Sequence, residues 1–261
     1  MNPRTLPAAI VVLAVLIGSR PARAEEVKVL SAVGMRQVMS VLAVEFEKAS
    51  GHRLSLSFDS GAMIVRRLAG GESADVVLVP RAAAQELVGL GRALEGSVVD
   101  LATSRVGLAV RKGAPKPDIS SPDALRRALL GAGSIACPDP RLGGSSGVHV
   151  AGVLKQLGIA DAIASKMVVS SHPDREDEMP GRRVADGQAE MALHQIQELM
   201  AVPGVEVVGP LPADLNQTFV FSAALVAGSP RGEAARALIA FLRTPRATAV
   251  VRSTGMEPPT R

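Results

Sequence analysis

Short apolar, β-branched segments alternate with helical segments along most of the chain, and this alternation limits the fold more than any other feature. Val27–Ser31, Arg53–Phe58 and Ala74–Val79 have the composition of strands, and Met35–Ala49 and Ala62–Ala69 between them carry apolar residues at helical spacing. Strands that alternate with helices of about ten to fifteen residues predict α/β layers with mainly parallel sheets.

A second set of such units follows the turn-rich segment Pro115–Pro122. Asp174–Arg183 is charged, and we expect a solvated surface segment there, with a helix at Glu178–Ala185 disfavoured by Pro180 and Gly181. The further predicted strands are Val98–Leu101, Val106–Arg111, Ser134–Ala136, Met167–Ser170, Glu190–Leu193, Val205–Val208 and Thr218–Val226. The further predicted helices are Arg81–Val88, Asp123–Leu130, one that follows Ser145-Ser146-Gly147 and runs to Leu157, Glu233–Leu242 and Pro245–Arg252.

The first 24 residues have the pattern of a secretory signal peptide. Arg4 precedes the apolar stretch Leu6–Ile17, and Ala22-Arg23-Ala24 forms a small-residue cleavage site. An uncleaved anchor would need about 20 apolar residues, and Pro7 interrupts a shorter stretch here. Cleavage after Ala24 leaves a net charge of about +1 instead of +4. Because of the signal peptide, we expect a soluble protein exported to the periplasm.

Composition excludes several kinds of site. Cys137 is the single cysteine, which rules out an internal disulfide, and we expect it to be a small core residue. The chain has neither Trp nor Tyr, which argues against stacking platforms for single-stranded nucleic acid. Phosphate-loop, dinucleotide and serine-hydrolase motifs are missing, and no His/Cys spacing is typical of zinc. We therefore expect no cofactor, no metal and no nucleic-acid partner.

Three small-residue loops come directly before helical segments: Ser31-Ala32-Val33-Gly34, Asp59-Ser60-Gly61 and Gly143-Gly144-Ser145-Ser146-Gly147. The first amides of a helix have no acceptor within the helix and lie at the positive end of its dipole, so each loop can bind an anion. A serine at such a position caps its helix more often than it contacts a ligand. Three such loops after strands raise the odds of a ligand site, because open α/β sheets bind ligands there.

Two long runs at the start of the predicted mature chain carry a family resemblance. Residues 27–58, VKVLSAVGMRQVMSVLAVEFEKASGHRLSLSF, and 59–80, DSGAMIVRRLAGGESADVVLVP, resemble the opening of periplasmic molybdate-binding proteins, and the likeness continues through GQAEMALHQIQEL to the C-terminus. The resemblance implies a type II periplasmic binding protein, with two α/β domains joined by two crossing strands around a ligand cleft. Domain 1 is then 25–104 plus 219–261, and domain 2 is 105–218 with hinge segments at both ends.

The resemblance also implies the ligand contacts. Ser31 with Ala32 and Gly34, and Ser60 with Gly61, match the two serine loops that hold an oxyanion, and Ser145 and Ser146 lie by the family's third contact loop. Where molybdate binders have a tyrosine after a valine, this chain has Gln195 after His194. Gln195 can donate from its amide, but the replacement leaves the identity of the anion open.

The segment that contains HQIQEL and AVPGVEVVGPLP is similar to a branch of the family that includes periplasmic aconitate isomerase. That resemblance gives an alternative function, an enzyme that moves a double bond in a tricarboxylate. The reaction needs an acid and a base, for which His149 and His194 are the candidates, and cations for the carboxylates, for which we expect Arg36, Arg66 or Arg141.

The first expectation is a solute-binding protein of an ABC importer that binds molybdate, tungstate or a similar small anion through helix starts and serine hydroxyls. Its expected partners are that anion and an ABC permease, and the protein itself is expected to be a monomer. A tetrahedral oxyanion needs a small pocket lined by neutral donors, whereas a tricarboxylate needs more room and a guanidinium. Cleft-facing arginines would therefore favour the isomerase.

Overall fold

The computed structural model describes residues 24–170 and 175–259. The predicted signal peptide lies almost entirely outside these residues. Within them no helix is long and apolar enough to cross a membrane.

The strands are β1 Glu26–Ala32, β2 Arg53–Asp59, β3 Val76–Pro80, β4 Val99–Ser104, β5 Val106–Arg111, β6 Ile135–Pro138, β7 Met167–Ser170, β8 Met191–Gln195, β9 Val205–Pro210 and β10 Phe219–Leu225. The α-helices are α1 Arg36–Ser50, α2 Gly61–Ala69, α3 Arg81–Gly89, α4 Pro122–Gly131, α5 Ser145–Gln156, α6 Ala160–Ile163, α7 Pro180–Ala185, α8 Ile196–Met200, α9 Gly232–Phe241 and α10 Pro245–Ser253. The 3-10 helices are η1 Val33–Met35, η2 Pro140–Leu142, η3 Ala164–Lys166, η4 Glu176–Glu178 and η5 Ala213–Leu215.

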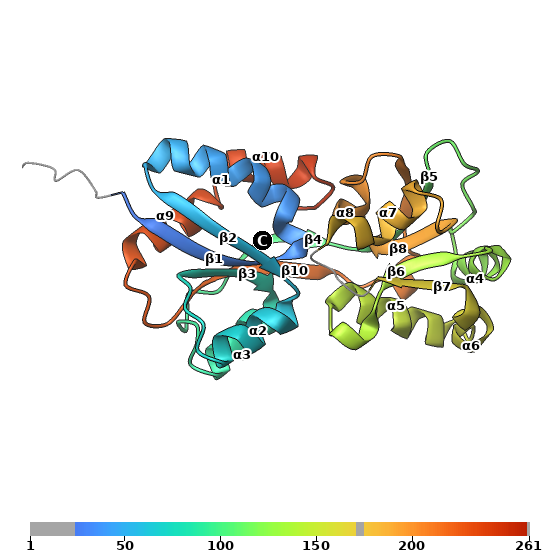
Figure 1. Ribbon diagram of the computed structural model, residues 1–261, viewed down its shortest axis with the longest axis horizontal. Coiled ribbons are helices and arrows are strands. Elements are labelled where there is room, and N and C mark those ends of the chain that lie inside the picture. The colour runs from blue at the N-terminus through green and yellow to red at the C-terminus, as the bar shows by residue number, and fades with distance from the viewer. Residues whose placement is uncertain (1–23, 171–174, 260–261) are drawn as a thin grey trace, which may run out of the picture.

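The described residues form two five-stranded sheets, one in each lobe of Figure 1. The strand orders are β2-β1-β3-β10-β4 and β7-β6-β8-β5-β9, so both sheets have the same arrangement. In the first sheet β1 is parallel to β2 and β3, and β10 is antiparallel to both β3 and β4. In the second, β6 is parallel to β7 and β8, and β5 is antiparallel to both β8 and β9. Each sheet is therefore mixed, with one strand opposed to the other four.

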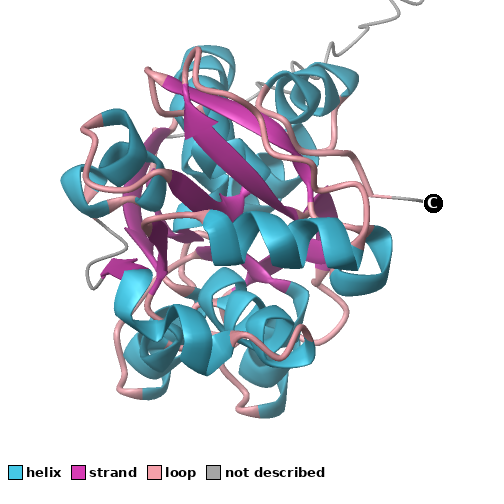
Figure 2. Ribbon diagram, turned by 90° about the vertical axis from the view of Figure 1, so that its right-hand side faces the viewer, coloured by secondary structure: helices cyan, strands magenta, loops and turns pink. Residues whose placement is uncertain are grey.

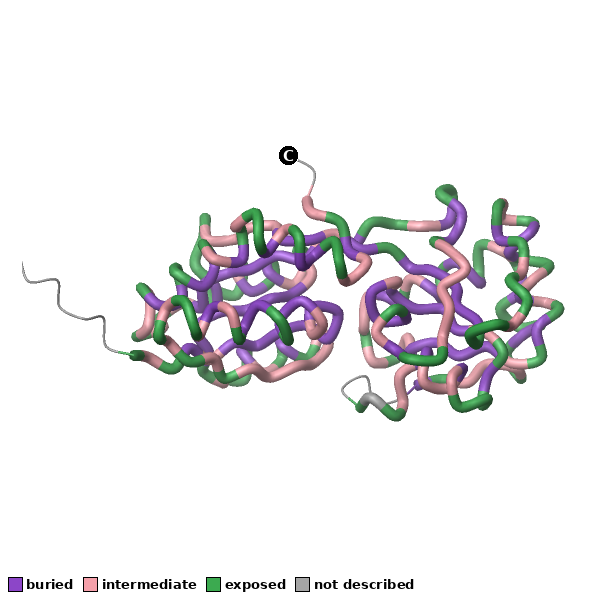
Figure 3. Tube along the Cα trace, turned by 90° about the horizontal axis from the view of Figure 1, so that it is seen from above, coloured by how far each residue is buried: buried purple, intermediate pink, exposed green. Residues whose placement is uncertain are grey.

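Each sheet is buried between helices. In the first lobe α1 and α10 cover one face and α2 and α3 the other, and helices surround the second sheet as well (Figures 1 and 2). Strand β3 packs on both sides, because Val76 and Leu78 belong to one apolar cluster and Val77 and Val79 to another. Figure 3 shows buried segments running through the inside of each lobe, with the exposed residues at its outside.

Local sequence sets where several helices begin and end. The side chains of Ser60, Ser121 and Thr244 each accept a hydrogen bond from a backbone amide three residues on, at the starts of α2, α4 and α10. Helix α1 ends at Gly51, whose φ of 76° is a left-handed conformation that glycine adopts without strain. Of these caps, Ser60 holds its helix start directly at a strand end, since β2 ends at Asp59.

The chain passes between the sheets twice, at Arg105 and again between β9 and β10. The side chain of Asn216 joins the two passages, since its Nδ2 donates to the carbonyl oxygens of Val106 at 2.8 Å and Leu211 at 3.3 Å. Its Oδ1 accepts from the Val106 amide at 3.3 Å. Both connections are thus held together at the boundary between the domains.

The expected fold class is confirmed, since two mixed-sheet α/β domains are present, and Cys137 is a buried core residue as predicted. Burial, with a smaller contribution from Asp139, raises the pKa of its thiol to about 12, so the thiol is unreactive. The expectation of a wholly solvated segment up to Arg183 is wrong, because Pro180 and Gly181 are buried at the start of α7. Proline is tolerated in the first turn of a helix, so Pro180 begins α7 instead of preventing it.

Candidate functional site

A small cavity of about 60 Å³ lies between the two sheets, at the carboxyl ends of β1, β2, β3, β6, β7 and β8. Its position follows from the topology, since parallel strands end at the same edge of a sheet and the two edges face each other. The residues that line it are Ala32, Val33, Gly34, Asp59, Ser60, Gly61, Pro80, Pro138, Asp139, Leu142, Gly144, Ser145, Ser146, Ser170, His194, Gln195, Glu198 and Phe221. No lysine or arginine lines it in the described part of the chain.

The wall from the first sheet consists of two helix starts. Ala32, Val33 and Gly34 lead through η1 into α1, and Ser60 and Gly61 begin α2. The hydroxyl of Ser60 accepts from the Met63 amide at 3.2 Å, so it caps the helix as well as lining the cavity. Gly34 is required for close packing, because a Cβ there would lie 2.8 Å from Phe221 Cζ and 3.1 Å from Gln195 Oε1.

The start of α5 forms a third side of the cavity. Gly144 caps the helix, and Ser145, Ser146 and Gly147 form its first turn, one turn earlier than the sequence predicts. Gly147 lets this turn sit against the end of β6, because a Cβ there would lie 3.0 Å from the Pro138 carbonyl oxygen. Three helix starts therefore surround the cavity, and their first amides have no acceptor within their own helices.

A glutamine network joins the domains beside the cavity. Gln197 Nε2 donates to the Gly34 carbonyl oxygen at 3.2 Å and to Gln195 Oε1 at 2.7 Å, and Gln197 Oε1 accepts from the Ser104 hydroxyl. Gln195 is 5% exposed and lines the cavity. The side-chain oxygen of Gln195 already accepts a hydrogen bond from Gln197, so the side-chain NH₂ group of Gln195 is the part that can donate to a ligand.

Glu198 and His194 form a buried pair on the wall from the second sheet. Glu198 Oε1 lies 3.6 Å from His194 Nδ1, and the two residues are 8% and 7% exposed. Burial raises the pKa of Glu198 to about 8, against a smaller opposite effect of the Arg36 charge, and burial lowers the pKa of His194 to about 4. At neutral pH the carboxyl is therefore mostly protonated and the imidazole is neutral.

Two buried polar atoms of residues on this wall have no hydrogen-bond partner among the described residues: Ser170 Oγ and His194 Nδ1. Both residues line the cavity, and Ser170 is only 2% exposed. An unpaired buried polar group costs about 1–3 kcal/mol, so these atoms indicate a place where a polar ligand binds.

Asp139 adds a charged carboxylate to the same wall. Arg141 donates to both of its oxygens, from Nε at 3.0 Å and from an NH₂ group at 2.6 Å, and these bonds lower the pKa of Asp139. The Arg141 side chain is 83% exposed and points away from the cavity lining, so it neutralises Asp139 and does not contact the cavity.

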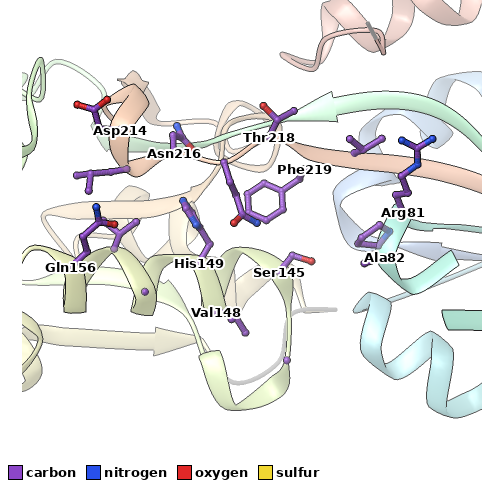
Figure 4. A pocket seen from close by; sticks show the side chains of 17 residues that line it. Arg81, Ala82, Ser145, Val148, His149, Gln156, Asp214, Asn216, Thr218 and Phe219 are labelled. Atoms are coloured by element: carbon purple, nitrogen blue, oxygen red, sulfur yellow. The ribbon is translucent and has the colours of Figure 1, made fainter. Parts of the chain in front are cut away.

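A second, larger groove of about 810 Å³ lies beside the cavity and shares Pro80 and Ser145 with it. Figure 4 shows His149 pointing from α5 toward Phe219, with Ser145 at the helix start and Arg81 on the opposite side. The His149 and Phe219 rings meet edge-on with centroids 5.6 Å apart, and burial lowers the pKa of His149.

The cavity lining includes most of the predicted ligand contacts: Ala32, Gly34, Ser60, Gly61, Ser145, Ser146, His194 and Gln195. Ser31 is fully buried outside the lining, and its hydroxyl donates to the Ala32 carbonyl oxygen at 3.1 Å. His149 lines the groove instead of the cavity. None of the three predicted arginines lines the cavity, and Arg36 stacks 4.5 Å from the centre of the Phe58 ring.

Sequence reasoning missed Glu198, Ser170 and Asp139 as cavity residues. Glu198 stands four residues after His194, a spacing that could have drawn attention to it, although a strand-to-helix junction separates the two. Ser170 and Asp139 lie where β7 and β6 end, the same position relative to a strand as the predicted loops. No group of three or more His, Cys, Asp or Glu residues suited to a metal ion occurs in the described part of the chain.

Two α/β domains with a cavity at their facing strand ends are the fold of the two-domain periplasmic binding proteins. The family model described as bacterial extracellular solute-binding protein matches residues 27–257, and the chain belongs to that family.

The proteins similar to this chain include an enzyme and binding proteins. The chain is 35% identical to aconitate isomerase from a Pseudomonas species, over 94% of each protein, and 27% identical to the molybdate-binding protein ModA of Azotobacter vinelandii, over 90% of each. The solved structure of the Azotobacter vinelandii periplasmic molybdate-binding protein superposes with a TM-score of 0.74 at 20% identity, covering 90% of this chain and all of that one. Relatives therefore include both a binding protein and an enzyme.

Proposed function

We propose that the chain binds a small organic acid by a carboxylate group in the interdomain cavity and isomerises it by proton transfer. One observation carries this proposal: a cavity surrounded by three helix starts also contains a buried carboxyl and a buried imidazole 3.6 Å apart. Helix starts bind anions, and a neutral acid beside a neutral base can exchange protons with a ligand. The 35% identity to an aconitate isomerase supports aconitate as the first substrate to test.

The charge balance of the cavity supports a carboxylate ligand. Asp139 is neutralised by Arg141 and Asp59 by Arg67, and Glu198, with its raised pKa, is mostly uncharged at neutral pH. A protonated Glu198 carboxyl adds no negative charge to the cavity as the ligand binds, and the fraction of Glu198 that is ionised, which grows as pH rises toward 8, is available as a base. The Ser170 hydroxyl, which has no hydrogen-bond partner among the described residues, is a further donor.

A second candidate is a receptor for a tetrahedral oxyanion such as molybdate, which would deliver it to an ABC permease. The size of the cavity favours this candidate, since one water needs about 10–15 Å³ of such space and 60 Å³ suits only a few heavy atoms. The absence of lysine and arginine from the described lining also favours it. For the organic acid, the adjoining groove supplies the extra room beyond Pro80 and Ser145.

Thermal unfolding of residues 25–261, followed by circular dichroism with molybdate, cis-aconitate or trans-aconitate, separates the two candidates. A ligand at 100 times its Kd stabilises the fold by about 2.7 kcal/mol, which raises Tm by about 5–10 °C in a chain of this size. We expect this shift with at least one aconitate isomer and interconversion of the isomers by proton NMR, with chloride at equal ionic strength as the control. A shift with molybdate alone would replace the first candidate by the second.

A further inference from the structure

We propose that Glu198 is the catalytic residue that takes the proton from the substrate and returns it, and that His194 only positions and shields it; this rests on the isomerase activity proposed above. Glu198 lines the cavity from the first turn of α8, and the helix starts at Gly34, Gly61 and Ser145 line the same cavity.

The chemistry of Glu198 suits a single proton carrier. The pKa of a general base works best near the operating pH, and burial raises the pKa of Glu198 to about 8. His194 is a poor base by comparison, because burial lowers its pKa to about 4. The proposal thus assigns the proton transfer to a carboxyl that the sequence did not single out, instead of to the candidates His149 and His194.

The proposed step is a balanced 1,3-shift. The ionised Glu198 carboxylate removes a proton from the carbon beside a substrate carboxylate, and the electron pair of the broken C–H bond spreads over the adjacent double bond. Glu198 then returns that proton to the far carbon of the three-carbon unit, where a new C–H bond forms as the double bond moves. The residue ends ionised as it began, and no oxidant, reductant or further reactant is consumed. The substrate class is an unsaturated organic acid with a second carboxylate next to its acidic C–H.

Few charged groups face Glu198. His194 of β8 lies 3.6 Å away, and the charge of Arg36 on α1 lowers the pKa of Glu198. The cavity also presents Asp59 and Asp139 from the ends of β2 and β6. On the other elements that pack against α8, charged side chains are engaged in contacts of their own: Glu206 of β9 with Lys116 at 2.6 Å, Arg182 of α7 with Asp186 at 3.9 Å and Arg183 of α7 with Gln188 at 2.6 Å.

The test compares Glu198→Gln, Glu198→Asp and His194→Gln with the wild type, using trans-aconitate. General base catalysis contributes about 100- to 10,000-fold, so we expect Glu198→Gln to lose at least about 100-fold in kcat while its ligand-induced Tm shift remains. Glu198→Asp keeps the carboxyl and is expected to recover part of the rate. His194→Gln is expected to keep turnover and to change the pH at which kcat is half-maximal. Glu206→Gln, on the exposed surface, is the matched control.

Wild-type kcat is expected to rise with pH to a midpoint near 8, because the ionised carboxylate is the base. Full turnover by Glu198→Gln, or loss of turnover in His194→Gln alone, would overturn the assignment to Glu198. If the wild type binds trans-aconitate but does not interconvert the isomers, the proposed proton transfer and the proposed isomerase activity are both wrong. The protein is then a binding protein for an organic acid. No binding of either aconitate isomer would overturn the proposed function as a whole. Circular dichroism of each variant separates these outcomes from misfolding.

Discussion

The two walls of the cavity differ in the groups that they present. The wall from the first sheet offers two helix starts, and the carboxylate that it adds to the described lining, Asp59, is paired with Arg67 at 3.5 Å. The wall from the second sheet offers one helix start, at Ser145, and adds the buried pair of His194 and Glu198. Backbone amides keep their charge distribution at every pH, whereas protonation of Glu198 changes the second wall. The difference indicates that both walls bind the anion and that the second wall also acts on it.

The close packing of the first wall is tested by Gly34→Ala, for which we expect the largest effect. The added methyl group would lie 2.8 Å from Phe221 Cζ, and such overpacking costs about 1–3 kcal/mol. Displacement of η1 should also weaken anion binding by at least about tenfold. Chemical unfolding and ligand titration measure both effects. Gly89→Ala, with no neighbour within 4 Å of the added atom, is the control, and equal effects of the two changes would contradict the close packing.

The protonation of the second wall is tested by the stability of Glu198→Gln at two pH values. Folding raises the pKa of Glu198 from 4.5 to about 8, so the folded chain holds a proton that the unfolded chain has released between those values. Stability from this group therefore falls as pH rises toward 8. We expect the Tm of Glu198→Gln relative to wild type to increase by several degrees from pH 5 to pH 8.5. A constant difference would show that Glu198 ionises normally in the folded chain.

Two serines, one on each wall, are expected to change stability in opposite directions. Ser60→Ala removes the cap on the Met63 amide and should cost about 1 kcal/mol. Ser170→Ala removes a hydroxyl without a partner in the described residues, so stability should stay constant or increase. Both changes should weaken anion binding several-fold. Denaturant midpoints with ligand titration measure the pair, and a loss of stability in Ser170→Ala would argue that its hydroxyl is already bonded.

The smallest effect is expected for Arg141→Gln, which removes the ion-pair partner of the Asp139 carboxylate on the second wall. The Arg141 side chain is 83% exposed, so its loss should cost less than about 1 kcal/mol of stability. Anion affinity should still fall several-fold at low salt, because Asp139 is no longer neutralised. Arg66→Gln removes the same charge from an exposed position in α2 and is the matched control. Equal affinities of the two variants would contradict a role for Asp139 in the charge of the cavity.

The sequence allowed the small-residue loops of the cavity to be predicted better than the buried acids of its second wall. Small residues at strand ends are visible as a local pattern, and the edge-to-edge geometry of parallel strands then brings Ser60 and Ser145 together. Glu198 depends on burial by residues distant in sequence, and its spacing of four residues from His194 is a weak local signal because a strand-to-helix junction separates the two. Ser31 and His149 follow plausible patterns but lie outside the cavity lining, since side-chain direction depends on packing.

The central claim is that the anion binds at the helix starts between the two sheets. A titration of the uniformly ¹⁵N-labelled chain with trans-aconitate, followed by ¹H–¹⁵N NMR, tests it most directly, because an amide that donates to an anion changes its chemical shift. We predict the largest saturable shifts at the amides of Gly34, Gly61 and Ser146. Saturable shifts confined to the groove, around Gly152 and Asn216, would contradict binding in the cavity.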